Sequence, residues 1–174
     1  VFHILNHAIF KAALFMNAGI VDHETGTRHI PHLGGLLHAM PITATLAMVA
    51  AASMAGLPPL NGFLSKEMML HEAVSTAWLG SDWAVAAMAT LAACFSVAYA
   101  LRYVGHVFFG KTRSELPRTP HDPPLGMWLP PALLVVLVVL IGLFPDPVAG
   151  PLVASVSRVV TGGEVMDYHL ALWH

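Results

Sequence analysis

Three ionisable side chains recur at intervals of four residues near the start of the chain: His3, His7 and Lys11. On an α-helix this spacing turns each residue only about 40° from the previous one, so the three form one narrow polar stripe. Histidine accepts a proton on one ring nitrogen while it releases one from the other, and a lysine removed from water holds its proton less firmly. The residue types and their spacing therefore favour a proton relay.

The segment that carries this stripe is otherwise largely apolar. Ionisable residues within a membrane span usually face the interior of a helix bundle or water, where they mark a proton or ion path. The structural alternative is a lysine that reaches out to the membrane surface, with two histidines at the interface. Lys11 lies in the middle of its segment rather than at an end, and this favours the relay.

A second polar group follows a break between two helical patterns. The break contains two glycines and two prolines: Gly56, Pro58, Pro59 and Gly62. Proline lacks a backbone N–H and interrupts the helical ladder. Backbone groups freed within a membrane persist where they line a cavity, and in transporters such breaks form ion sites. We expect Lys66, just beyond the break, to belong to the relay; the alternative is a short interfacial loop with a hydrated lysine.

Three neighbours of Lys66 are candidate supporting residues of the relay: Ser65, Glu67 and His71. Glu67 favours the charged lysine, so the pair can alternate between a held and a released proton. His71 follows Glu67 by one turn and either continues the path or only pairs with Glu67. Glu72 points to a different helix face and is expected to be solvated or to pack against a helix.

The remaining histidines do not indicate a metal site or a cofactor. Several crowd one loop, but their spacings match no zinc pattern and no cysteine joins them, so no metal is expected: His23, His29, His32 and His38. His3 and His7 share one helix and cannot face each other across a haem ring. We therefore expect no bound cofactor.

The composition is that of a membrane protein: 56% of the residues are hydrophobic, only 10% are charged, and the mean hydropathy is +0.69. A soluble domain carries about 25% charged residues, so lipid must solvate much of this surface. The net charge of −2, without any basic run, argues against a nucleic-acid partner. The single cysteine, Cys94, excludes an internal disulfide framework.

The apolar pattern predicts an all-α, polytopic transmembrane helix bundle with one discontinuous helix, within a single membrane domain over residues 1–174. The expected spans are residues 1–21, 40–57 continued by 63–79 as the broken helix, 83–109 and 128–144, with a weaker helix at 148–160. The basic residues of the connections lie after the first and third spans, which places those loops in the cytoplasm: Arg28, Lys111, Arg113 and Arg118. Because the chain does not begin with Met, we expect an internal fragment of a longer protein.

The stretch from His3 to Lys11, with Leu14-Phe15 and Ala18-Gly19 after it, resembles an antiporter-like helix of proton-translocating subunits. Such subunits occur in the respiratory NADH dehydrogenase complex and in Mrp-type antiporters. The break before Ser65-Lys66-Glu67 is similar to the discontinuous helix of the same superfamily. Three features look most like the A-type subunit of the multisubunit Mrp Na⁺/H⁺ antiporter: Gly26-Thr27-Arg28 before Leu33-Gly34-Gly35-Leu36, the run Met54–Phe63, and Tyr168–His174.

This resemblance implies a multi-pass protein of the bacterial inner membrane, a transporter subunit rather than an enzyme. It implies antiport of Na⁺ and H⁺ by secondary transport, in a hetero-oligomer with other antiporter subunits. His3, His7 and Lys11 then match the central proton relay, and Lys66 matches the ionisable residue of the broken helix. The alternatives are a proton-pumping subunit of an NADH dehydrogenase-like redox complex, and a scaffold whose polar residues only pack helices.

Overall fold

The computed structural model describes residues 1–78, 81, 83–111 and 116–163, and within these residues it contains helices and no strand. The helices are α1 (Phe2–Thr25), the 3₁₀ turn η1 (Ile30–His32), α2 (Pro41–Ala55), α3 (Asn61–Ser75), α4 (Ala84–Val107), α5 (Leu125–Leu143) and α6 (Pro145–Val160). The all-α class predicted from the sequence is confirmed. The segment Tyr168–His174, which contributed to the resemblance, lies outside the described residues.

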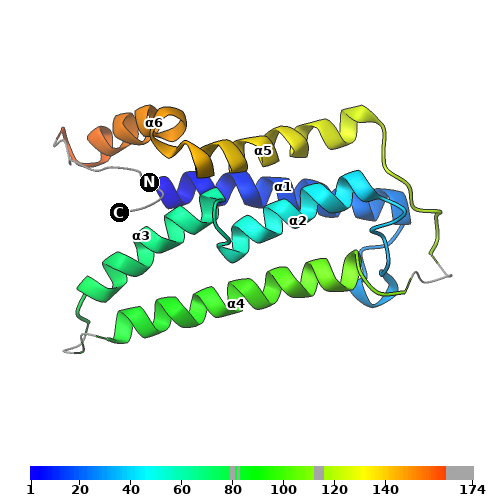
Figure 1. The fold of residues 1–174 in the computed structure, drawn as a ribbon, viewed down its shortest axis with the longest axis horizontal. Helices are drawn as coiled ribbons and strands as arrows, with labels where there is room; N and C mark the ends of the chain where they lie inside the picture. The colour runs from blue at the N-terminus through cyan, green and yellow to red at the C-terminus, as the bar shows by residue number, and fades with distance from the viewer. Residues whose placement is uncertain (79–80, 82, 112–115, 164–174) are drawn as a thin grey trace.

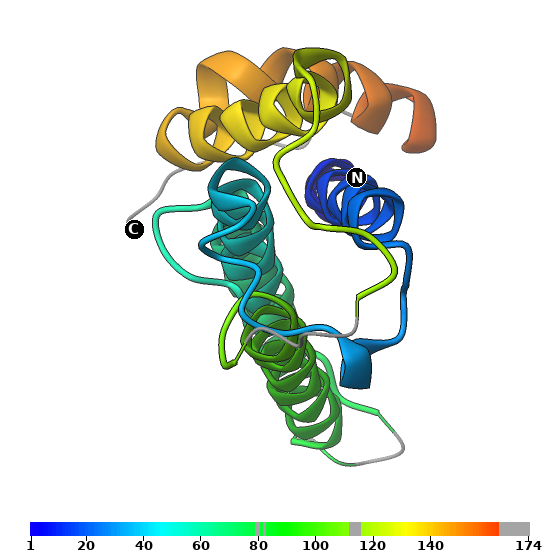
Figure 2. The same cartoon turned by 90° about the vertical axis from the view of Figure 1, so that its right-hand side faces the viewer.

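The helices form an elongated bundle in which α1 packs against α2, α3 and α5, and α4 packs against α2 and α3 (Figure 1). The view along the bundle separates α5 and α6 on one side from α4 on the other, with α1 and α2 between them (Figure 2). By length and apolar composition, three of the described helices are sufficient to cross a membrane, namely α1, α4 and α5, and α2 is apolar but shorter.

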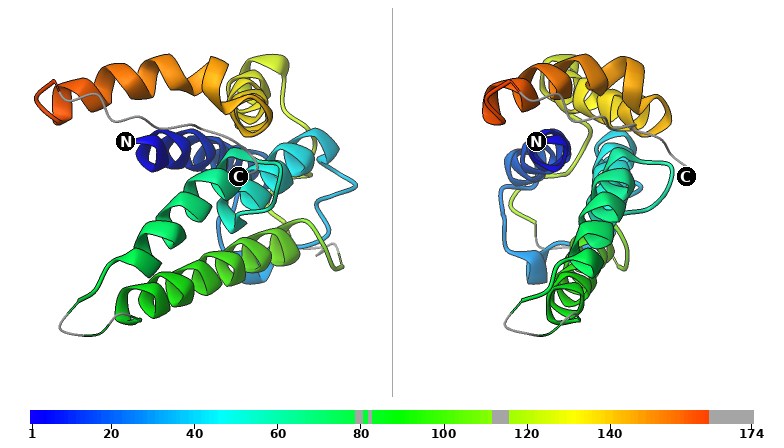
Figure 3. Two further views of the ribbon diagram at one scale, coloured as in Figure 1. Left: turned by 60° about the vertical axis from the view of Figure 1, so that its left-hand side comes forward. Right: turned by 90° about the vertical axis from the view of Figure 1, so that its left-hand side faces the viewer.

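The discontinuous helix predicted from the sequence is present as α2 and α3. α2 ends at Gly56, which adopts the left-handed conformation with φ 89° and donates its N–H to the carbonyl oxygens of Ala52 and Ser53. Glycine populates this region without the steric penalty of a side chain. A few residues later the chain enters α3, which runs beside α4 to the far end of the bundle (Figure 3).

Two glycines allow the backbone to pack closely at the break. A Cβ atom on Gly62 would overlap the carbonyl oxygen of Ser53, at the end of α2. A Cβ atom on Gly142 of α5 would overlap the carbonyl oxygen of Pro59 and would come within 2.9 Å of the Asn61 nitrogen. Glycine is thus required at both positions for the two half-helices and α5 to approach one another.

The helix bounds differ from the predicted spans by three residues or more at four ends: the ends of α1 and α3 and the starts of α5 and α6. α1 continues past Val21 to Thr25, whose hydroxyl donates to the Val21 carbonyl oxygen at 2.6 Å, and it stops at the left-handed Gly26. α3 stops at Ser75 because hydroxyl groups there bind carbonyls of the last turn, including Thr76 Oγ1 to the Glu72 oxygen at 2.8 Å. α6 begins earlier, at Pro145, because proline suits the first helical position.

Residues of the connection between α4 and α5 contact the C-terminal end of α1 and the start of α2. The buried carboxylate of Glu24, in the last turn of α1, contacts Nδ1 of His23 at 2.9 Å and Nδ1 of His121 at 3.3 Å. Asp122 accepts hydrogen bonds from the backbone N–H groups of Ile42 and Thr43, each at 3.0 Å. This carboxylate satisfies free donors at the start of α2 and interacts favourably with the positive end of its dipole.

The close approach at Gly62 predicts a strong effect of a single methyl group. Gly62→Ala is expected to lower the free energy of unfolding by about 1–3 kcal/mol, because the backbone of α2 must move to admit the Cβ atom. Thermal unfolding of the detergent-solubilised complex measures this effect. Gly105→Ala in α4 is the matched control, since no atom lies within 4 Å of the added carbon. Equal stability of the two variants would contradict the packing described for the break.

Candidate functional site

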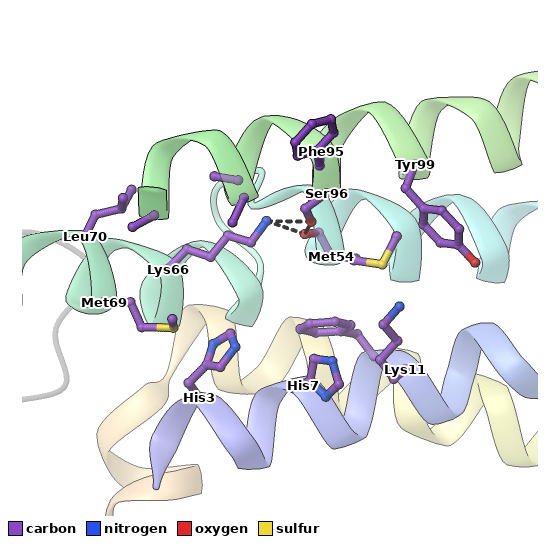
Figure 4. Close-up of a pocket in the computed structure, with 14 residues that line it drawn as sticks. His3, His7, Lys11, Met54, Lys66, Met69, Leu70, Phe95, Ser96 and Tyr99 are labelled. Carbon is purple, nitrogen blue, oxygen red and sulfur yellow. Dashed lines mark hydrogen bonds between the residues drawn. The ribbon is translucent and has the colours of Figure 1, made fainter. Parts of the chain in front are cut away.

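A cavity of about 460 Å³ lies among α1, α3 and α4 and collects most of the ionisable side chains predicted from the sequence. The polar side chains that line it come from three helices: His3, His7, Lys11, Lys66, Ser96 and Tyr99. The first three project from one side of α1 towards α3 and α4 (Figure 4). The four residues assigned to the relay thus line a single cavity.

The α1 stripe presents its groups in sequence along this cavity. The rings of His3 and His7 lie 6.0 Å apart between centroids, and the ring of His7 meets the ring of Phe10 edge-on at 5.4 Å. His3 and Lys11 are half-buried and His7 is exposed. No hydrogen bond joins the two histidine rings within the described part of the chain, and one water molecule can bridge rings at this separation.

The ammonium group of Lys66 is held at the helix break. Nζ donates to the carbonyl oxygen of Met54 at 2.6 Å and to Oγ of Ser96 at 2.9 Å (Figure 4). In a continuous helix the Met54 carbonyl would accept the N–H of the residue four positions later. That residue is Pro58, which has no N–H, so the break supplies the acceptor that binds the lysine.

Ser65 connects α3 to the first histidine of the stripe. Its Oγ lies 3.2 Å from Nδ1 of His3 and 3.3 Å from the carbonyl oxygen of Gly62. When the hydroxyl donates to Gly62, the contact with His3 requires a proton on Nδ1; when it donates to Nδ1, that nitrogen is the acceptor. The pair therefore accommodates two proton arrangements without any change in helix position.

Lys11 lies against an aromatic ring of α4. Its Nζ is 5.2 Å from the centre of the Tyr99 ring, within the range of a cation–π interaction. A smaller cavity of about 60 Å³ adjoins Lys11 on this side and is lined by Tyr99 and Tyr103. The hydroxyl of Tyr103 is buried and has no hydrogen-bond partner within the described part of the chain.

A buried polar network fixes the three helices close to the relay. Nδ2 of Asn61 donates to Oδ1 of Asn6 at 3.0 Å, and Oγ of Ser53 donates to Oδ1 of Asn61 at 2.6 Å. The backbone N–H of Gly62 in turn donates to Oγ of Ser53 at 3.1 Å. Asn6, Ser53 and Asn61 are fully buried. The network ties α1 to both halves of the broken helix.

The supporting residues suggested by the sequence occupy different positions. Ser65 contacts His3, whereas Glu67 and His71 are exposed on α3 and are not among the residues that line this cavity. Glu72, which the sequence assigned to solvent or to packing, lines an adjoining cavity of about 450 Å³ that also contains His3. No group of three or more potential metal ligands occurs among the residues that the structure describes.

Sequence reasoning missed Ser96, Tyr99 and the asparagine network. Asn6 offered a signal, because an amide in an apolar span requires a buried partner. Ser96 and Tyr99 offered none: a serine or a tyrosine in a long apolar helix is common, and their importance depends on which face α4 turns towards the cavity.

The profile of a protein family described as "NADH:quinone oxidoreductase/Mrp antiporter, TM" matches residues 1–96. The chain belongs to this family. The full chain aligns with a probable K⁺/H⁺ antiporter protein of Rhizobium meliloti (strain 1021), an A/B-type subunit, at 51% identity and over 18% of that protein. It also aligns over its full length with the A1-type subunit of a Na⁺/H⁺ antiporter of Staphylococcus aureus (strain JH9), at 39% identity and over 23% of that protein.

Two solved structures are also similar to the chain. The Mrp complex from Dietzia sp. DQ12-45-1b matches 99% of the chain at 39% identity with a TM-score of 0.81, over 18% of the matched chain. The membrane-bound sulfane sulfur reductase, an archaeal respiratory membrane complex, matches 83% at 31% identity with a TM-score of 0.74, over 23% of its chain. The predicted resemblance to the A-type antiporter subunit is confirmed, and the chain spans about a fifth of the length of these relatives.

Because Asn61 links three helices through the polar network, it is expected to stabilise the fold more than Asn17, a buried asparagine outside the network. Asn61→Ala is expected to lower the free energy of unfolding by about 1–3 kcal/mol more than Asn17→Ala, since it leaves buried groups on two other helices unpaired. Asn17 is the matched control, because it is equally buried but its amide binds only the Ala13 carbonyl of its own helix. Thermal unfolding in detergent compares the two. A smaller loss for Asn61→Ala would rule out the network as a principal tie between the helices.

Proposed function

We propose that the chain is the proton-conducting part of a cation/proton antiporter subunit, and that protons pass through the cavity by way of His3, His7, Lys11 and Lys66. The observation that carries this proposal is that these four groups, from α1 and α3, line the same cavity. A scaffold whose polar residues only pack helices has no reason to gather exchangeable protons around a space large enough for water.

Each group has a defined task in this proposal. Lys66 stores a proton against the Met54 carbonyl and releases it to water in the cavity. His3 takes the proton on one ring nitrogen and releases it from the other, with Ser65 reorganising beside it. His7 and Lys11 extend the path along α1, and water bridges the gaps that exceed hydrogen-bond reach. The direction of net flow follows the proton gradient.

The same proposal assigns the crossings of the membrane. α1, the pair α2 and α3, α4 and α5 cross it, and α6 lies at its surface. Arg28, Lys111 and Arg118 gather at the end opposite the N-terminus of α1, so the positive-inside rule supports a cytoplasmic location for that end. We place the subunit in the bacterial cell (inner) membrane, a location that the bacterial source of the two antiporter relatives supports.

We assign Na⁺ as the exchanged cation and other antiporter subunits as the partners. The names of the two antiporter relatives support exchange of an alkali cation, Na⁺ in one case and K⁺ in the other. The subunit then works as a secondary transporter and not as an enzyme. A proton pump driven by redox chemistry uses the same kind of relay, and the similarity to an archaeal respiratory complex keeps it as the second candidate. It predicts proton movement that depends on electron transfer and not on a cation gradient.

Neutralising either relay lysine is expected to abolish transport without preventing assembly. Lys11→Ala and Lys66→Ala in the complete complex should each lower Na⁺-dependent proton flux in everted vesicles by about tenfold or more, because a positioned proton donor or acceptor contributes roughly 10²–10⁴ in rate. Lys111→Ala removes an exposed lysine outside the cavity and should leave the flux unchanged. Parallel assays with K⁺ identify the preferred cation.

Assembly of each variant is measured by co-purification of the other subunits. Loss of flux in an assembled complex supports the relay. Persistent flux in both Lys11→Ala and Lys66→Ala would eliminate the relay and leave the scaffold as the better interpretation. Proton movement that requires an electron donor and ignores Na⁺ and K⁺ would favour the redox pump.

A further inference from the structure

We propose that α4 positions both relay lysines, with Ser96 orienting Lys66 and Tyr99 orienting Lys11. This inference rests on the proposed function, because it concerns residues that act through the relay lysines. It assigns a role to a helix that carries no lysine or histidine within the cavity.

The two α4 residues share one helix face. They are three positions apart, a spacing that puts side chains on neighbouring turns of the same side of a helix. Both line the cavity, and Figure 4 shows Ser96 beside Lys66 and Tyr99 beside Lys11. α4 itself is supported by α2 and α3, so its register relative to the helix break is fixed by packing.

Ser96 completes a closed set of hydrogen bonds around Lys66. Its hydroxyl donates to the Met54 carbonyl oxygen at 2.8 Å and accepts from Lys66 Nζ at 2.9 Å, while Nζ also donates to the same carbonyl at 2.6 Å. An ammonium group has three N–H donors, and these contacts use two of them. The third remains for water in the cavity. Ser96 thus orients the Lys66 side chain and stabilises its ammonium form.

Tyr99 has the corresponding effect on Lys11 through its ring. Within the described part of the chain, no hydrogen bond or ion pair reaches the Lys11 ammonium, and the contact that it makes is the Tyr99 ring at 5.2 Å. The negative face of an aromatic ring attracts a cation and does not attract a neutral amine. Tyr99 therefore attracts the Lys11 ammonium and holds it in the space between α1 and α4.

The titratable groups that share the cavity lining with the two lysines come from α1 and α4, and on α3 the exposed Glu67 and His71 follow Lys66 in sequence. α1 contributes His3 and His7, and α4 contributes Tyr99 and Tyr103. α2 supplies the Met54 carbonyl and no titratable side chain to this lining. Since Ser96 has no charge of its own, a change at this position alters proton release only through Lys66.

The test measures the pH profile of cation-dependent proton flux in the assembled complex. Ser96→Ala removes one acceptor of the ammonium group, so Lys66 releases its proton at lower pH. The pH above which the flux falls should therefore decrease by about one unit. Tyr99→Leu removes the ring that holds the Lys11 ammonium and should lower the maximal flux by about threefold, whereas Tyr99→Phe, which keeps the ring, should retain the wild-type flux. Thr90→Val is the matched control on α4, because its exposed hydroxyl binds only the Ala86 carbonyl of the same helix.

A second pair of variants separates the hydroxyl from packing. Ser96→Thr and Ser96→Val have nearly the same shape, and only the first retains the donor and acceptor, so only Ser96→Val should shift the profile. Unshifted profiles in Ser96→Ala and Ser96→Val and an unchanged flux in Tyr99→Leu, with flux abolished in Lys66→Ala and Lys11→Ala, would overturn the inference and leave the proposed function intact. Retained flux in the two lysine variants would overturn the proposed function itself.

Discussion

The carbonyl oxygen of Met54 lacks a helical partner because Pro58 occupies the position that would provide the N–H. In an apolar environment such a group must be satisfied by protein or by water. The structure satisfies it with the Lys66 ammonium and the Ser96 hydroxyl. The unpaired carbonyl of the broken backbone therefore holds the charged Lys66 side chain within the bundle and brings Ser96 of α4 against the break.

The asparagine network and the relay occupy the two sides of this break. On the buried side, Ser53 of α2 accepts the Gly62 N–H at the start of α3 and donates to Asn61, which in turn donates to Asn6 of α1. His7 follows Asn6 directly in sequence and points to the other side, into the cavity. In one turn of α1, Asn6 thus joins the helix to the break and His7 lines the proposed proton path. Positioning the relay and stabilising the break are tasks of the same short segment.

The sequence was sufficient for those features that depend on periodicity along one helix or on local backbone chemistry. The stripe of His3, His7 and Lys11 follows from 3.6 residues per turn, and the discontinuous helix follows from Pro58 and Pro59. The sequence did not predict the contacts between helices, because the rotation of α4 about its axis depends on how its residues pack against α2 and α3. A single sequence does not specify that rotation, so Ser96 remained an ordinary serine. Helix ends were also displaced where side chains cap the backbone, as with Thr25.

In the proposed relay, water in one cavity joins the ionisable groups of α1 to Lys66. An electron cryo-microscopy map of the complete complex, at a resolution that displays ordered water, tests this claim most directly. Water molecules are expected within hydrogen-bond reach of four side chains and in a continuous chain between them: His3, His7, Lys11 and Lys66. A cavity filled by apolar side chains from another part of the complex, with no water between the histidines and Lys66, would contradict it.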